Sequence, residues 1–219
     1  MFSKEYIRTI AEKLGIKKEV KTVPRESYSY TVVEDEKSIT VYLTEKDPIT
    51  LAEALAISKL KENDPLITAG DFEPLFPEDL KKRFTFLVHP IQMFWAYDLL
   101  RKCEVNDVYS RILSFSEFTL KVVAESTGIK RALNNPENFS IVAEHFLTVY
   151  DHYRRTKTDS IPHYLSKILD LEELKGLHTY LKYLDVTPSS RVYLDLADLA
   201  GIPVAITECK GKPVFSIKK

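Results

Sequence analysis

Histidines are the side chains of this chain best suited to acid–base or metal chemistry, and the 219-residue sequence holds five of them. His145 and His152 are seven residues apart in a segment whose hydrophobic spacing predicts a helix. Their rings would therefore be about 10 Å apart along the helix axis. Two ligands for one metal on a helix are normally one turn apart. We therefore expect both to be partly buried, hydrogen-bonded side chains, and we expect His163 and His178 to pack between helices.

Motifs for a reactive nucleophile or a bound phosphate are missing from the sequence. No G-x-S-x-G turn is present to expose a serine. The six glycines include none in G-x-G-x-x-G or G-x-x-x-x-G-K spacing, which disfavours Rossmann and P-loop enzymes, and we expect no cofactor. Cys103 follows apolar residues at a predicted helix end, where a buried, unreactive thiol is expected. Cys103 and Cys209 could form one long-range disulfide, which no secretory signal supports.

The elements that would position these residues begin with a short helix and a small sheet. Apolar residues recur at helical spacing from Ile7 to Leu14, with Ser3 as the expected N-cap and Gly15 as the stop. Alternation of apolar and polar residues predicts a small antiparallel sheet with strands in three stretches, 20–23, 28–32 and 39–43. Strong helix formers then predict a helix over residues 50–62.

The rest of the chain is predicted to be a helical body closed by a β-hairpin. Pro90 is expected in the first turn of a helix that runs to about Lys102, and Thr187 is expected to cap the last helix. Further helices are expected over residues 79–88, 107–127, 138–155, 162–169, 171–185 and 188–200, and hairpin strands over 203–207 and 213–217. The fold class is therefore α+β. Residues 1–103 hold the sheet and its helix, and residues 104–219 hold the other helices and the hairpin, together in one compact unit.

The longest uncharged run, residues 84–97, is either the centre of the core or a surface for a partner. It is too short to span a bilayer, which needs about 20 apolar residues. We expect no membrane span. Because the N-terminus also lacks an export signal, we expect a cytoplasmic protein.

The charge balance disfavours a nucleic-acid binder. Lys and Arg number 31 against 32 Asp and Glu, and 44% of the residues are hydrophobic, as in a folded protein. The basic clusters have acidic residues nearby, so we expect solvated helix ends at 17–18, 81–83 and 154–155. Charge carried mainly by Lys and Glu is typical of thermophile proteins.

The order of the N-terminal elements, over about residues 3–103, resembles the N-terminal half of zincin-type metallopeptidases, and so does the segment Ala52-Glu53-Ala54-Leu55-Ala56. In that family the matching helix carries H-E-x-x-H, whose two histidines bind Zn²⁺ while the glutamate polarises a metal-bound water. Here the glutamate is Glu53, and alanines take both histidine positions. Because a methyl group cannot coordinate a metal, the resemblance implies a zincin-like protein without a metal.

His89 is the one candidate metal ligand, since it lies, with Asp98 after it, about where some zincins place downstream ligand and support residues. Glu53 would be catalytic only in an active enzyme. In the alternative interpretation, Ala52 and Ala56 form a small-residue face that lets the helix lie close to a sheet, and Glu53 is solvated.

The function implied by the resemblance is that of a catalytically inactive protein that binds a peptide or protein partner, because a free sheet edge accepts an extended chain by strand addition. Three alternatives stay open. One is an active metal-dependent hydrolase with non-standard ligands, for example Glu53, His89 and a later histidine. Another is a nucleic-acid-associated factor, which salt-dependent binding would reveal. The third is a plain oligomer subunit, which its size in solution would reveal.

Overall fold

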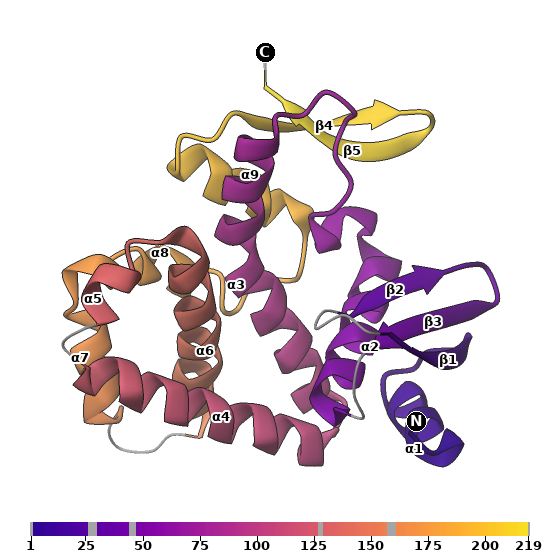
Figure 1. The fold of residues 1–219 in the computed structure, drawn as a ribbon, viewed down its shortest axis with the longest axis horizontal. Coiled ribbons are helices and arrows are strands. Elements are labelled where there is room, and N and C mark those ends of the chain that lie inside the picture. Colours follow the sequence, from indigo (N-terminus) through magenta and orange to yellow (C-terminus); the bar gives the residue numbers. More distant parts are fainter. Residues whose placement is uncertain (1, 26–29, 44–46, 127–128, 157–160, 219) are drawn as a thin grey trace. The chain divides into compact units, whose positions relative to one another are not determined.

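The computed structural model describes residues 2–25, 30–43, 47–126, 129–156 and 161–218, and it confirms the α+β class (Figure 1). The chain forms two compact units, each built from two separate stretches. The sheet unit comprises Met1–Asn63 and Ala96–Ile112. The helical unit comprises Asp64–Trp95 and Leu113–Lys219. Among the described residues, no helix is long and apolar enough to cross a membrane.

The sheet unit contains a three-stranded sheet in the order β1-β3-β2, formed by β1 (Glu19–Pro24), β2 (Thr31–Glu34) and β3 (Ser38–Leu43). The prediction of a purely antiparallel sheet was wrong for β1, which pairs with β3 in parallel, whereas β2 and β3 form the expected antiparallel hairpin. Burial explains the order of the strands. Alternate residues of β3 are buried along its whole length, while β1 and β2 are more exposed, so β3 takes the centre of the sheet. The neighbour of β1 is therefore β3, which runs in the same direction as β1.

Two helices complete the first stretch of the sheet unit. In α1 (Lys4–Lys13), the Ser3 hydroxyl accepts a hydrogen bond from the Tyr6 N–H, and Gly15 follows the helix with a φ of 66°, as predicted. In α2 (Pro48–Asn63), Leu51 and Leu55 are fully buried, and the helix packs against β2 and β3. The predicted helix over 50–62 and its position on the sheet are confirmed.

Helix α3 (Glu78–Lys102) runs through Pro90 without a break, so the two helices predicted for this segment are one. A proline inside a helix costs about 3 kcal/mol, because it removes a backbone hydrogen bond. Burial of the apolar residues around Pro90 offsets that cost. These residues include Phe84, Val88, Ile91 and Phe94. The uncharged run is therefore core.

The helical unit contains the C-terminal half of the sequence. Its elements are α3 up to Trp95, α4 (Asn106–Glu125, from Leu113 on), α5 (Ile129–Ala132), α6 (Pro136–Arg155), α7 (His163–Leu169), α8 (Leu177–Leu181), α9 (Ser190–Leu199), β4 (Val204–Cys209) and β5 (Lys212–Ile217), with two 3-10 turns, η1 (Pro65–Thr68) and η2 (Glu172–Leu174). The antiparallel hairpin of β4 and β5 is confirmed.

Two details of the helical unit differ from the sequence prediction. The single helix expected over 171–185 is split into η2 and α8. Gly176 lies between them, where an added Cβ would come within 3.1 Å of the Phe139 ring. The cap of α9 is Ser189 rather than Thr187, since the Ser189 hydroxyl accepts from the Arg191 N–H. The predicted end of the helix over 107–127 lies outside the described residues.

Candidate functional site

Residues 52–56, which were compared with the H-E-x-x-H motif, lie on α2 in the sheet unit. Ala52 and Ala56 have no exposed surface, which fits the small-residue face considered above. The Glu53 carboxylate is partly buried and accepts a hydrogen bond of 2.7 Å from the hydroxyl of Tyr97. Glu53 is therefore partly exposed to solvent and also hydrogen-bonded within the sheet unit. Because the Tyr97 side chain is itself buried, its hydroxyl needs an acceptor, and Glu53 supplies one.

Asp98, the expected support residue, has its own partners in the sheet unit. Its carboxylate forms ion pairs with Arg101 and Lys102, at 2.5 and 2.6 Å. Burial opposes ionisation of Asp98, but the hydrogen bonds from Lys102 and Arg101 outweigh it, so the pKa lies below its ordinary value. This carboxylate is held by two basic side chains of its own helix.

His89, the candidate metal ligand, lies in the helical unit, where its Nε2 is 3.0 Å from an oxygen of Glu144. Next along α6, His145 places its Nδ1 3.0 Å from the hydroxyl of Ser116 on α4. Burial lowers the pKa of His145; the charge of Glu144 opposes this shift and His89 adds to it. Across the described residues, no three His, Cys, Asp or Glu side chains gather in a way that could hold a metal ion.

The pair of Ser116 and His145 does not form a catalytic site. A serine beside a histidine is the arrangement of an activated nucleophile. Ser116, however, has no exposed surface, so its hydroxyl cannot meet a substrate. The prediction of a buried, hydrogen-bonded His145 is confirmed. His163 and His178 are exposed, so the expectation that they pack between helices was wrong.

Both cysteines are free thiols, so the long-range disulfide is not formed. Burial raises the pKa of Cys103, which leaves it a poor nucleophile.

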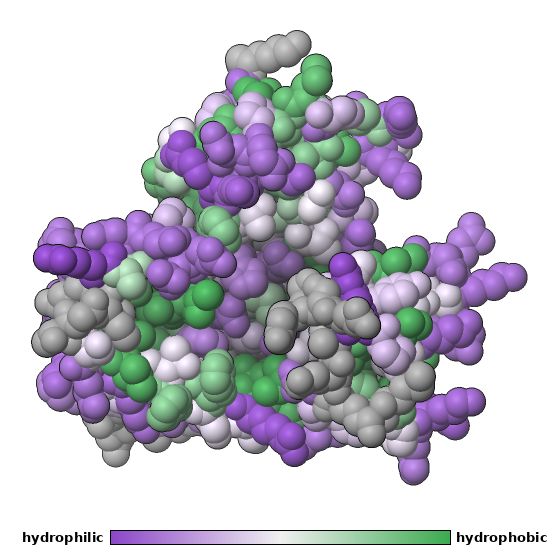
Figure 2. All heavy atoms as spheres, viewed as in Figure 1, coloured by the Kyte–Doolittle hydropathy of each residue, from purple (hydrophilic) through white to green (hydrophobic). Residues whose placement is uncertain are grey.

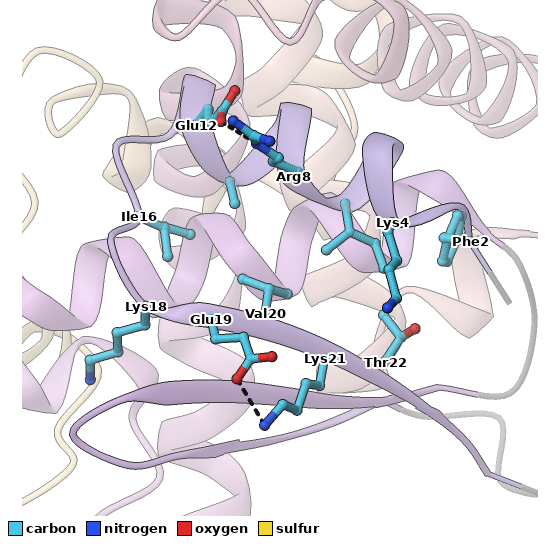
Figure 3. A pocket seen from close by; sticks show the side chains of 12 residues that line it. Phe2, Lys4, Arg8, Glu12, Ile16, Lys18, Glu19, Val20, Lys21 and Thr22 are labelled. Carbon is cyan, nitrogen blue, oxygen red and sulfur yellow. Dashed lines mark hydrogen bonds and ion pairs between the residues drawn. The ribbon is translucent and has the colours of Figure 1, made fainter.

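A groove of about 510 Å³ lies between α1 and β1 in the sheet unit (Figure 3). Its floor is apolar and is formed by Ile7, Ala11, Ile16 and Val20. In Figure 3, Val20 points from β1 toward α1, and Lys4 extends from α1 toward Thr22. Sequence reasoning missed this groove, because the distance of α1 from β1 depends on tertiary packing that neither segment encodes locally.

The strand that borders the groove has a free edge. Glu19 and Arg25 donate their N–H groups to carbonyls at the two ends of β3, each at 3.0 Å. In a parallel pair, alternate residues direct both backbone groups to the neighbouring strand. Val20 and Thr22 therefore direct their N–H and C=O groups away from β3. No other described strand pairs with β1 on that side.

The rim of the groove carries more positive than negative charge. Its basic side chains are Lys4, Arg8, Lys18 and Lys21, and its acidic side chains are Glu12 and Glu19. Both acids are already paired, Glu12 with Arg8 at 2.6 Å and Glu19 with Lys21 at 2.9 Å. Lys18 is paired as well, with Glu34 at 2.7 Å. Lys4 has no ion pair with another residue that the structure describes. The groove therefore combines an apolar floor, a free strand edge and a basic rim.

No protein-family model matches this chain, and no curated protein matches it either.

Proposed function

We propose that the chain is a catalytically inactive, zincin-like protein whose sheet unit binds an extended peptide along β1. The observation that carries the proposal is the free edge of β1 beside the groove under α1. An extended peptide adds to such an edge as a further strand, and side-chain pockets next to the edge select its sequence.

The residues on α2 support the inactive part of the proposal. Alanine methyl groups at positions 52 and 56 cannot bind a metal, and both are fully buried. Glu53 accepts the Tyr97 hydroxyl, so its carboxylate has a structural partner in place of a metal-bound water. These positions stabilise the helix that packs against the sheet.

The energetics require both the strand edge and the groove. Val20 and Thr22 offer two N–H donors and two C=O acceptors, and a backbone hydrogen bond contributes about 0.5–1.5 kcal/mol. Loss of translational and rotational freedom costs about 4–15 kcal/mol. The four backbone groups together contribute about 2–6 kcal/mol, which covers only the low end of that cost. An apolar side chain on the groove floor adds about 1.5–3 kcal/mol, and acidic neighbours gain from the basic rim.

The test uses a short, end-blocked peptide of alternating glutamate and valine, with a lysine–valine peptide as the charge control. We expect the acidic peptide to bind with a Kd of roughly micromolar to millimolar size, and the basic peptide to bind more weakly. Isothermal titration calorimetry gives the affinities, and NMR shifts of backbone amides give the location.

A proline substitution separates backbone pairing from side-chain contact. Thr22→Pro removes one N–H of the free edge and leaves the bonds to β3 in place. Thr22→Ala is the matched control, since it keeps that N–H. We expect Thr22→Pro to abolish binding and Thr22→Ala to retain it, with circular dichroism showing both folded. Equal binding by the two variants, or amide shifts away from β1, would contradict the proposal.

A further inference from the structure

Helix α4 carries apolar side chains on two faces. One face is buried and includes Val108, Ile112 and Leu120. A second set is exposed, with Phe115 at 59%, Phe118 at 66% and Val122 at 44% of their surface. We call these three residues the α4 stripe. Figure 2 shows hydrophobic residues at the surface over α4 and α6.

The α4 stripe follows the spacing of a helix that pairs with another helix. Its residues alternate at three and four positions, which keeps them on one face because each residue turns the helix by about 100°. Arg111 lies one turn before Phe115 on this face, and Glu125 lies one turn after Val122. Along the helix, this face therefore carries a positive charge, two aromatic residues, one aliphatic residue and a negative charge.

This order is self-complementary under a two-fold axis through Phe118. Two antiparallel copies of α4 would place Phe118 against Phe118, Phe115 against Val122, and Arg111 against Glu125. A parallel pair would instead place each charge against its like. Arg111 and Glu125 are both exposed, and neither has an ion pair among the described residues. Isologous dimers need such a surface, on which each residue meets its two-fold counterpart.

We propose that the α4 stripe is the contact between two copies of this chain, which pair α4 with α4 in antiparallel orientation. The occupant is a second copy because the face complements itself in antiparallel orientation, with apolar residues against apolar residues and Arg111 against Glu125. Exposed apolar clusters of this kind are typical of interaction sites on otherwise polar surfaces. The contact is independent of peptide binding at β1.

The first experiment measures the dimer dissociation constant by sedimentation equilibrium. Phe118→Ala removes the central aromatic pair from both subunits, and we expect it to weaken the dimer by about a hundredfold or more. Leu199→Ala is the matched control, because Leu199 is an apolar helix residue with a similar exposure of 61%. We expect this control to leave the constant unchanged.

The second experiment determines the orientation by disulfide formation in a Cys103→Ser, Cys209→Ser background. Position 118 lies on the two-fold axis, so the two cysteines of a Phe118→Cys dimer should form a disulfide between the subunits on oxidation. Phe115→Cys and Val122→Cys should each stay monomeric on a non-reducing gel, since like positions would be about 9–12 Å apart along the helix. A mixture of these two variants should cross-link.

Charge reversal gives a third measurement. Arg111→Glu alone should weaken the dimer by about tenfold, and Arg111→Glu combined with Glu125→Arg should restore it. A chain that stays monomeric at every concentration overturns the proposal, and so does a dimer that tolerates Phe118→Ala. Cross-linking of Val122→Cys with itself overturns the antiparallel pairing.

Discussion

Placing histidines at positions 52 and 56 tests whether α2 is a packing helix. The double variant Ala52→His, Ala56→His completes the H-E-x-x-H pattern around Glu53. Both alanines have no exposed surface, so each imidazole must enter a filled space. We expect the variant to be strongly destabilised and not to bind stoichiometric zinc.

The size of the effect follows from burial at the two positions. Overpacking of a core costs about 1–3 kcal/mol per site. An imidazole that is buried without a hydrogen-bond partner costs about 1–3 kcal/mol more. The two sites together therefore cost about 4–12 kcal/mol, against a typical total stability of about 5–15 kcal/mol.

The assay is urea denaturation followed by circular dichroism, with and without zinc, together with metal analysis of the purified protein. Asn63→His is the matched control, because it places a histidine at an exposed position of the same helix. A folded double variant that binds one zinc ion, and that zinc stabilises against urea, would refute the packing argument and reveal a pre-formed metal geometry.

Three further predictions concern stability. Because burial lowers the pKa of His145, the unfolded chain binds more protons, so stability should fall as pH drops below the ordinary value of 6.5, and His145→Gln should flatten this dependence in urea titrations. The Asp64 carboxylate caps η1 and also accepts a hydrogen bond of 2.6 Å from the Ser190 N–H. Asp64→Ala should therefore lower the free energy of unfolding by about 1–3 kcal/mol, measured by urea unfolding followed through Trp95 fluorescence. An unchanged unfolding midpoint would contradict the capping role. Gly15 has a φ of 66°, so Gly15→Ala should cost about 1 kcal/mol in thermal melts, and a more stable variant would show that the backbone relaxes.

Local signals in the sequence were sufficient where one segment determines its own structure. Ser3 and Gly15 predicted the ends of α1 because capping and a left-handed stop are properties of a few adjacent residues. The hairpins were predictable for the same reason, since alternation and a turn determine an antiparallel pair.

Sequence patterns did not predict the structure correctly where a residue's conformation or contacts depend on a segment far away in the sequence. The parallel position of β1 depends on which strand has two neighbours, and alternation alone does not encode that choice. Pro90 stays inside α3 because tertiary burial outweighs its helix-breaking tendency. The partner of Glu53 comes from Tyr97, which lies 44 positions later. The α1–β1 groove was not predicted either, because its shape depends on how two separate segments pack together.

Helix α3 has a consequence for how the protein can be divided and made. Its residues up to Trp95 belong to the helical unit, and those from Ala96 belong to the sheet unit. A fragment that ends at Asn63 would lack Tyr97, the donor to Glu53. During synthesis, the sheet unit therefore has all of its residues only after residues 96–112 have been made, and no single proteolytic cut can separate the two units from each other.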